Sequence, residues 1–285
     1  MRRLGVVVAL LVAALAVWGV SGGSAVRAAE TCGDENGNLR VMTFNIRTAL
    51  GTKNAGANPL HQLFEEHDVG PIVAAIAAAD PDVVALQEVL GWGQTGRIAR
   101  ALGMESSFAF HPSPLPWWGN AVLSKCPMTK TMRVVTSRGR GNGKAMPVAR
   151  LDVAGGAVFA TSIHRDREDN TGIQLQRMMA PFAQTDTPVL LMGDFNFKPN
   201  DKRHGVVSGV YEDSALVARA GAEYVLERGT YPVIAGTKKH RRIDYVFLSK
   251  GDFVVSNVAV IEGEHAEASD HLGYVADVML TPRAN

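Results

Sequence analysis

The sequence predicts an α/β fold in which β-sheets pack together and helices lie outside them. Two observations predict it: short apolar runs rich in Val, Ile and Phe recur along the chain, and segments with helical character lie between them. A third observation, the Ala154-Gly155-Gly156 turn between two of the runs, predicts a hairpin and therefore a partly antiparallel sheet. Because the chain has no internal repeat and no long linker, we expect one large domain.

Ten runs are expected to be strands, since each is apolar, rich in β-branched residues and bounded by Gly, Pro, Asp or Ser. In chain order they are residues 41–46, 83–87, 121–123, 132–136, 148–153, 158–163, 189–192, 243–248, 253–261 and 273–280.

Three segments are expected to be helices. Residues 68–79 begin with Asp68 and carry Pro71 in the first turn, as helices often do. Residues 171–184 have apolar side chains close to helical spacing, and residues 212–220 end before Gly221.

The composition excludes several classes of protein. Of the 285 residues, 46% are hydrophobic and 20% are charged, a balance that disordered, collagen-like and coiled-coil chains do not have. Lys and Arg number 29 against 28 Asp and Glu, so no overall basic field points to nucleic acid as a partner.

The first 29 residues are predicted to be a signal peptide. Arg2 and Arg3 precede the apolar run 4–20, and Val26-Arg27-Ala28 fits the small-residue pattern of a cleavage site. The alternative is an uncleaved anchor, because the run is close to the shortest that spans a bilayer. Cleavage would leave residues 30–285 as the mature domain, with 26 basic and 28 acidic side chains, in a secreted or periplasmic location.

The two cysteines, Cys32 and Cys126, both lie in the predicted mature chain. In an oxidising compartment they can form a disulfide; two buried thiols are the other interpretation. Their spacing is not that of a metal site, and neither is expected to be catalytic.

Acids, amides and histidines stand at the ends of several predicted strands. One such residue is ordinarily a helix cap or a turn residue, but sheets bring strand ends from distant sequence onto one rim. A rim that gathers several carboxylates needs a positive charge, and a hard divalent cation with oxygen ligands supplies it. The strand-end residues are Asn45, Glu88, His164, Asp194, Asn196, Asp244, Asp270 and His271.

Other chemistries lack their motifs. No Cys pair or His spacing typical of zinc is present, and no Gly-x-Ser-x-Gly elbow of a serine hydrolase. The Gly-rich residues 139–143 lie between two predicted strands and open no helix, unlike a nucleotide-binding loop.

Six short motifs, in their order along residues 40–280, resemble those of the endonuclease/exonuclease/phosphatase superfamily. Its members include pancreatic-type deoxyribonuclease, abasic-site endonucleases, bacterial sphingomyelinases and inositol-polyphosphate phosphatases. Each motif alone is weak, but the ordered set is specific. The motifs are MTFNIR at 42–47, VALQEV at 84–89, GNAVLS at 119–124, GDFN at 193–196, RIDY at 242–245 and SDH at 269–271.

The resemblance implies a four-layered α/β sandwich of two packed mixed β-sheets flanked by helices, and hydrolysis of a phosphoester that depends on Mg²⁺, with Mn²⁺ or Ca²⁺ as alternatives. It implies that Glu88 is the principal metal ligand, assisted by Asn45 and Asp270. Asp194 resembles the residue that orients or deprotonates the attacking water, and Asn196 the one that holds this water or a phosphate oxygen.

The resemblance also suggests a carboxylate–imidazole pair, Asp244 with His271, that can donate a proton to the phosphate or the leaving group. His164 resembles a second histidine of many members, although Arg165 follows it where those members often have Leu. Asn120 and Arg242 are expected to contact the substrate phosphate.

Two basic clusters bear on the substrate: Arg138, Arg140 and Lys144, and residues 238–242. If they flank the rim they favour a polyanion such as nucleic acid; otherwise they are solvated loops. Trp117 and Trp118 form either an exposed loop that touches bases or lipid, or a buried pair. The first expectation is a monomeric phosphodiesterase or nuclease. The alternatives are a lipid phosphodiesterase and a non-catalytic binding module.

Overall fold

The computed structural model describes residues 32–34, 37–52, 67–112, 117–138, 143–233 and 240–282. The predicted signal peptide lies outside these residues, as do Arg140, Lys238 and Lys239 of the basic clusters. Within the described part, no helix is long and apolar enough to cross a membrane.

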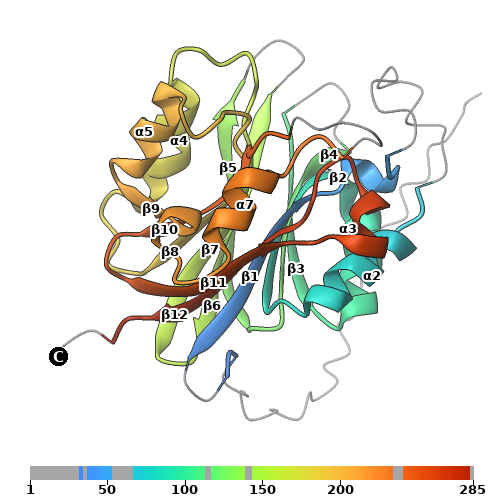
Figure 1. Ribbon diagram of the computed structural model, residues 1–285, viewed down its shortest axis with the longest axis horizontal. Coiled ribbons are helices and arrows are strands. Elements are labelled where there is room, and N and C mark those ends of the chain that lie inside the picture. Colours follow the sequence, from blue (N-terminus) through green and yellow to red (C-terminus); the bar gives the residue numbers. More distant parts are fainter. Residues whose placement is uncertain are drawn as a thin grey trace, which may run out of the picture. The chain divides into compact units, whose positions relative to one another are not determined.

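The described strands form two six-stranded sheets (Figure 1). In spatial order the first sheet is β11 (Phe253–Val260), β12 (Tyr274–Leu280), β1 (Asn38–Asn45), β2 (Val83–Leu90), β4 (Trp118–Ser124) and β3 (Glu105–Phe110). The second is β5 (Met128–Ser137), β6 (Lys144–Val153), β7 (Gly156–His164), β8 (Val189–Asp194), β10 (Asp244–Ser249) and β9 (Tyr211–Asp213).

Each sheet is mixed, because it contains one parallel pair among antiparallel neighbours. The parallel pairs are β1 with β2 and β7 with β8, and a helix lies between the two strands of each pair in the sequence. The predicted hairpin at Ala154-Gly155-Gly156 joins β6 and β7, which are antiparallel as expected.

The strands bury side chains on both faces of each sheet, so each sheet packs against the other sheet on one face and against helices on the other. On β1, Val41 belongs to the core between the two sheets, whereas Met42 and Phe44 pack toward the helices. Figure 1 shows α2 (Gly70–Ala79) and α3 (Gly91–Leu102) beside the first sheet, and α4 (Ile173–Met179) and α5 (Lys202–Ser208) beside the second. The predicted fold, two packed mixed sheets flanked by helices, is confirmed.

The helix predictions are correct in part. Residues 68–79 contain α2, and residues 171–184 contain α4 followed by the 3₁₀ turn η2 (Ala180–Phe182). The helix predicted at 212–220 is correct only over the short α6 (Ser214–Val217), which the Asp213 side chain caps, because residues up to Asp213 form β9 and pair with β10. Helix α7 (Ala222–Arg228) begins only after Gly221, and α3, α5, β3 and β9 were not predicted.

Two 3₁₀ segments complete the described elements: η1 (Arg47–Ala49) directly after β1, and η3 (Gly263–Ala268) before β12. Cys32 and Cys126 form a disulfide with an S–S distance of 2.00 Å, so that the first of the two interpretations is confirmed. The bond fixes the segment that precedes β1 to the turn between β4 and β5.

Candidate active site

The predicted site residues converge on one rim because five strands end or begin there. The parallel pairs place the ends of β1 and β2 together, and likewise those of β7 and β8. His164 and Asp194 are direct register partners at the ends of β7 and β8, and Asp194 is also the partner of Asp244 at the start of β10.

A β-bulge directs Glu88 into the rim. The register of β2 against β4 shifts between Leu86 and Val89, and both of these side chains pack toward the helices although they are three residues apart. Glu88 within the bulge has φ 55°, a left-handed backbone that a non-glycine residue rarely adopts. Bulges re-aim side chains next to functional sites, and strained residues cluster in such sites.

Asn45 joins the two sheets by bridging two carboxylates. Its Nδ2 donates to Glu88 Oε1 at 3.1 Å and to Asp194 Oδ2 at 3.2 Å, while its Oδ1 accepts the Arg47 backbone N–H at 3.1 Å. Ser269 Oγ donates to the Asn45 carbonyl oxygen at 2.7 Å. These bonds turn the amide nitrogen toward the carboxylates, so Asn45 positions Glu88 and Asp194, and its role as a metal ligand stays a prediction.

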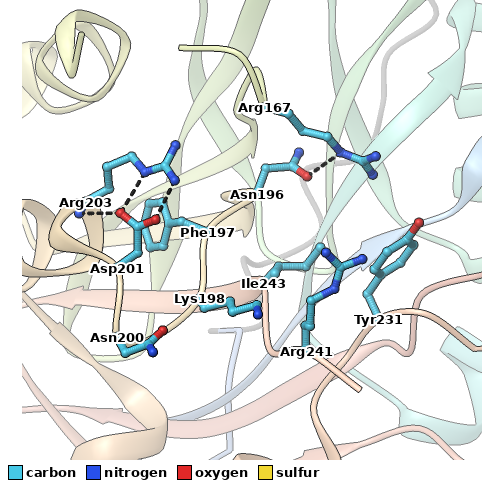
Figure 2. Close-up of a pocket in the computed structure, with 10 residues that line it drawn as sticks. All are labelled: Arg167, Asn196, Phe197, Lys198, Asn200, Asp201, Arg203, Tyr231, Arg241 and Ile243. Carbon is cyan, nitrogen blue, oxygen red and sulfur yellow. Dashed lines mark hydrogen bonds and ion pairs between the residues drawn. The ribbon is translucent and has the colours of Figure 1, made fainter. Parts of the chain in front are cut away.

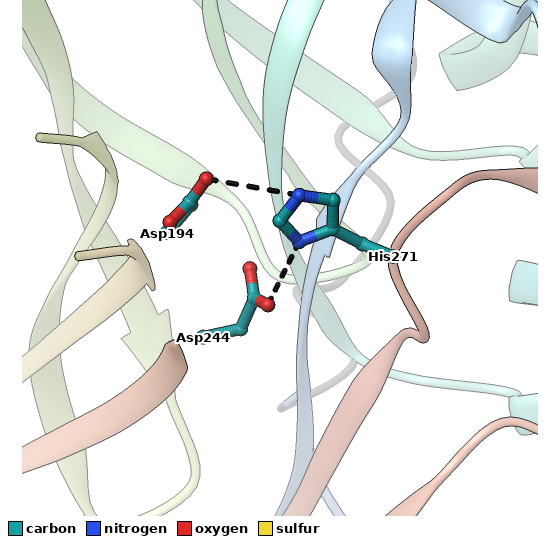
Figure 3. A group of neighbouring side chains, drawn as sticks. All are labelled: Asp194, Asp244 and His271. Atoms are coloured by element: carbon teal, nitrogen blue, oxygen red, sulfur yellow. Dashed lines mark hydrogen bonds and ion pairs between the residues drawn. The ribbon is translucent and has the colours of Figure 1, made fainter. Parts of the chain in front are cut away.

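Asp244, His271 and Asp194 form a buried chain (Figure 3). His271 Nδ1 lies 2.9 Å from Asp244 Oδ2, and His271 Nε2 lies 3.9 Å from Asp194 Oδ2. Burial alone would lower the pKa of His271, but Asp244 next to it, with Asp194 and Asp270, raises the pKa to about 10. The imidazole is therefore protonated at neutral pH and directs its second N–H toward Asp194.

The positive charges near the rim carboxylates do not offset their burial and mutual repulsion. Burial and the nearby Asp244 raise the pKa of Asp194 to about 7, although His271 opposes this. Burial also raises the pKa of Asp270, whose Oδ2 lies 3.8 Å from Arg47 Nε. Both shifts have the cause expected for like charges removed from water, and a bound cation would reverse them.

His164 lies in the rim as a neutral imidazole. Its Nε2 is 3.8 Å from Glu88 Oε1 and 3.7 Å from Asp194 Oδ2, and its Nδ1 is 3.5 Å from Lys144 Nζ. Burial, followed by the charge of Lys144, lowers the pKa of His164 well below its ordinary value. Since the Lys144 ammonium can only donate, Nδ1 accepts and the Nε2–H faces the carboxylates.

Asn196 lies between the buried Asp194 and the more exposed Arg167 and forms a hydrogen bond with each. Its backbone N–H donates to Asp194 Oδ1 at 2.9 Å, and its Nδ2 donates to the Arg165 carbonyl at 2.9 Å. Arg167 Nε donates to Asn196 Oδ1 at 2.8 Å. Like Glu88, Asn196 has a left-handed backbone, with φ 52°. The strained turn after β8 thus holds the Asn196 amide beside Asp194.

The two residues predicted to contact the substrate phosphate, Asn120 and Arg242, are both buried. Arg242 forms a buried ion pair with Asp213, to which it donates two hydrogen bonds at 2.8 and 2.6 Å. Asn120 is fully buried and donates to the carbonyls of Ala145 and Ser162 at 3.0 and 3.3 Å. Both side chains thus bond to protein groups under the rim, and a phosphate contact for either stays a prediction.

The donor set fits a hard divalent cation. Asp194, Asp244 and His271 each bring one ligand-type atom within 4.8 Å of the other two, but the imidazolium of His271 has no free nitrogen for a metal, so the oxygens of the carboxylates are the donors left for an ion. Asp244 Oδ1 is buried and has no hydrogen-bond partner among the described residues. Carboxylate oxygens are the ligands that Mg²⁺ and similar ions prefer, and Glu88 and Asp270 add two more carboxylates at the same rim.

Sequence reasoning missed Arg167 and Tyr231. The Tyr231 ring lies 4.5 Å from the His271 ring, centroid to centroid, and Arg167 reaches over Tyr231 at 5.7 Å. No strand or motif marks either residue, because both reach the site from loops. Lys144, by contrast, was noted in the first basic cluster, and the structure places it against His164.

The family described as Endonuclease/Exonuclease/phosphatase matches residues 42–271. No curated protein matches the chain.

Solved structures share the fold. An endonuclease/exonuclease/phosphatase from Bacteroides vulgatus is 18% identical over 86% of this chain and 99% of its own, with a TM-score of 0.68. A mannosyl-6-phosphatase from Bacteroides thetaiotaomicron is 19% identical over 85% and 99%, with a TM-score of 0.64. The human nocturnin catalytic domain, solved with a bound sulfate anion, is 19% identical over 86% and 94%, with a TM-score of 0.60.

Proposed function

The chain belongs to the endonuclease/exonuclease/phosphatase family, and from that premise we propose that it is a Mg²⁺-dependent phosphodiesterase that acts on nucleic acid. The observation that carries the proposal is the buried chain Asp244–His271–Asp194 at a rim that also holds Glu88. It places an imidazole that can donate a proton beside a carboxylate that can accept one. Hydrolysis of a phosphoester needs both a general acid and a general base.

Asp194 is the proposed base for the attacking water. Its Oδ2 lies 3.9 Å from His271 Nε2 and 3.7 Å from His164 Nε2, so this carboxylate faces the same space as both imidazoles and can accept a proton from a water held there. The Asn196 N–H and the Asn45 amide hold its two oxygens, so that the carboxylate stays in one orientation. The Asn196 side chain, which bonds to the Arg165 carbonyl and to Arg167 in this structure, is proposed to hold the water or a phosphate oxygen.

His271 is the proposed acid. With a pKa raised to about 10, its Nε2–H stays protonated and can donate to an oxygen of the phosphate or to the leaving oxygen. Asp244 holds the ring through Nδ1 at 2.9 Å. His164, which is neutral, is suited to donate its Nε2–H to a phosphate oxygen.

Glu88 and Asp270 are the proposed ligands of the metal, with Asn45 positioning Glu88. We favour Mg²⁺, with Mn²⁺ or Ca²⁺ as alternatives, since the available donors are oxygens. When bound, such an ion stabilises the negative charge that develops on the phosphate and lowers the pKa of water.

Hydrolysis of bis-p-nitrophenyl phosphate and of plasmid DNA tests the proposal. We expect activity with Mg²⁺, its loss in EDTA, and a fall of about 100-fold or more in kcat for His271→Ala. His265→Ala is the matched control, because His265 pairs only with the exposed Glu264. Activity that persists in EDTA, or in His271→Ala, would overturn the proposal.

A lipid phosphodiesterase is the second candidate, favoured by exposed aromatic side chains. Trp92, Phe110 and Trp117 are 64%, 39% and 49% exposed. Trp92 lies in the first turn of α3, directly after β2, while Phe110 ends β3 and Trp117 directly precedes β4, whose first residues pair with the end of β2 that follows Glu88. Such side chains can enter a membrane interface. Hydrolysis of sphingomyelin in vesicles, and its loss in Trp92→Ala with bis-p-nitrophenyl phosphate hydrolysis retained, would favour this candidate over a nuclease.

We further propose that the protein is exported and acts as a monomer. The disulfide between Cys32 and Cys126 supports export, because such bonds persist in oxidising compartments. Sequencing the N-terminus of protein recovered from outside the cytoplasm should find a start near residue 29 or 30. Light scattering on the purified protein should give the mass of one chain.

A further inference from the structure

A cavity of about 510 Å³ opens beside the catalytic residues (Figure 2). Loops after β7 and β8 and the segment before β10 supply its lining, which includes Arg167, Asn196, Lys198, Tyr231 and Arg241. In Figure 2 the side chains of Arg167, Tyr231 and Arg241 lie on one side of the cavity, and Asp201 and Arg203 lie across from them.

The cavity shares its wall with the catalytic residues at three points. The Asn196 N–H donates to Asp194 Oδ1 at 2.9 Å, and the Tyr231 ring lies 4.5 Å from the His271 ring. Ile243, also in the lining, directly precedes Asp244. A molecule bound at the rim can therefore continue into the cavity without crossing the protein.

The cavity carries an excess of positive charge. Its one acidic side chain, Asp201, is neutralised by Arg203, which donates to both carboxylate oxygens. Across the described residues, no carboxylate lies within 4.0 Å of the charged groups of Arg167, Lys198 or Arg241, so three cations have no ion-pair partner.

The Tyr231 ring holds two of these cations in place. The guanidinium of Arg241 lies 5.1 Å from the ring centroid, and that of Arg167 lies 5.7 Å from it. Both distances are in the range of cation–π contacts, which orient a guanidinium without neutralising it. Oriented guanidinium groups match the oxygens of a phosphate group.

We propose that this cavity binds a second phosphate group of the substrate whose first phosphate is hydrolysed at the rim. This inference rests on the proposed function and narrows its substrate to phosphoesters that carry a further phosphate beside the scissile one. The second phosphate can be the neighbouring phosphodiester of a polynucleotide or a second phosphate ester on a small polyol. The two sources share the chemistry that Arg167, Lys198 and Arg241 would recognise.

Equilibrium binding to the purified protein in the presence of Ca²⁺, with each ligand checked to be unhydrolysed afterwards, tests the subsite with a cation available to the rim. Calorimetry compares adenosine 3′,5′-bisphosphate with adenosine 5′-monophosphate, for the wild type, for Lys198→Ala/Arg241→Ala and for the matched control Lys130→Ala/Arg219→Ala, whose residues lie outside the cavity. We expect the wild type and the control to bind the bisphosphate at least about tenfold more tightly than the monophosphate, because one charged contact commonly gives that much. In Lys198→Ala/Arg241→Ala the ratio should fall below about threefold.

Two further ligands distinguish the sources. Preference for a 5′-phosphorylated thymidine dinucleotide over thymidine 5′-monophosphate supports the subsite and assigns it to a nucleic acid. Preference for inositol 1,4-bisphosphate over inositol 1-phosphate supports it and assigns it to a polyol. Equal binding of every monophosphate and its partner in the wild type, or an equal loss of preference in the control variant, would overturn the proposal.

Hydrolysis of bis-p-nitrophenyl phosphate by the same preparations separates this failure from that of the proposed function. Hydrolysis without a preference for a second phosphate refutes the subsite alone. A preference that depends on Lys198 and Arg241, without hydrolysis, refutes the catalytic proposal and leaves the anion-binding cavity standing.

Discussion

Replacing Arg242 by methionine should destabilise the fold rather than weaken substrate binding alone. The Arg242 side chain is 1% exposed, and its two hydrogen bonds to Asp213 measure 2.8 and 2.6 Å. Its guanidinium also stacks on the Tyr245 ring at 4.4 Å. Methionine keeps most of the packing volume but leaves the Asp213 carboxylate buried with only His204 and the Ala215 N–H as partners.

The expected loss is about 3–5 kcal/mol in the free energy of unfolding, the usual cost of removing one partner of a buried ion pair. Arg203→Met is the matched control, because Arg203 and Asp201 form a similar pair whose side chains are 20% and 23% exposed. Because both side chains of this pair reach solvent, its removal should cost less, about 1 kcal/mol. Both variants remove two hydrogen bonds to one carboxylate, so the difference between their losses in free energy of unfolding reports the effect of burial.

The loss should also depend on pH in a defined direction. Burial would raise the pKa of Asp213, but hydrogen bonds from His204 and Arg242 hold it below its ordinary value. A lowered pKa in the folded state stabilises the protein at pH values above the unfolded pKa and ceases to do so as the pH falls through the folded pKa. The difference between wild type and Arg242→Met should thus be largest near neutral pH and shrink below about pH 4.

Urea unfolding followed by circular dichroism at pH 7 and pH 3.5, with bis-p-nitrophenyl phosphate kinetics below the unfolding midpoint, provides the measurement. A loss below about 1 kcal/mol together with a rise of more than about tenfold in KM would refute the reasoning. That result would support the phosphate contact that the sequence predicts for Arg242.

Three further predictions concern stability. Removing the disulfide by Cys32→Ser/Cys126→Ser should lower the free energy of unfolding by about 4–5 kcal/mol, from the length of the loop it closes, and a loss under about 1 kcal/mol in urea unfolding would contradict this. Gly193→Ala should be strongly destabilising, because the new Cβ would lie 2.0 Å from a backbone oxygen of β7. Gly205→Ala, in a helix with open space around it, should instead gain about 0.5–1 kcal/mol. Mg²⁺ at about 100 times its Kd should stabilise the wild type by about 2.7 kcal/mol in thermal unfolding and Glu88→Gln by less, and equal effects on both would contradict the assigned ligand.

Much of the fold could be predicted from the sequence because its strands are apolar on both faces. The runs that begin at Val83 and Val189 have no polar alternation, which is typical of strands buried between a second sheet and a layer of helices. Short edge elements such as β3 and β9 lack that signal. Their place is set by pairing with β4 and β10, which a local pattern does not report.

The sequence predicts the place of a site residue when that residue stands at the end of a strand. It does not predict the place when this depends on a bulge, a loop or a buried partner. His164 and Asp194 meet because parallel strands end together. The aim of Glu88 depends on a bulge, and the burial of Arg242 depends on Asp213, 29 residues away. Arg167 reaches the site from a loop. Such contacts join segments that the sequence does not show to be neighbours.

The chain has nearly equal numbers of acidic and basic residues, but at the rim the two kinds lie apart, with carboxylates at the centre and cations around them. This separation affects which ligand can bind. Asp194 and Asp244 lie buried at the centre, and burial and mutual repulsion raise the pKa of Asp194. Cations surround this centre: Lys144 faces His164, and Arg167 holds Asn196. A carboxylate centre attracts a metal ion and repels a free anion, whereas the surrounding cations attract the anion. A phosphoester that binds together with a metal ion would suit both: the metal ion contacts the carboxylates, and the phosphate oxygens contact the surrounding Lys and Arg side chains. The arrangement therefore favours an anion that binds together with a cation. Neither the net charge nor a basic patch alone would predict this.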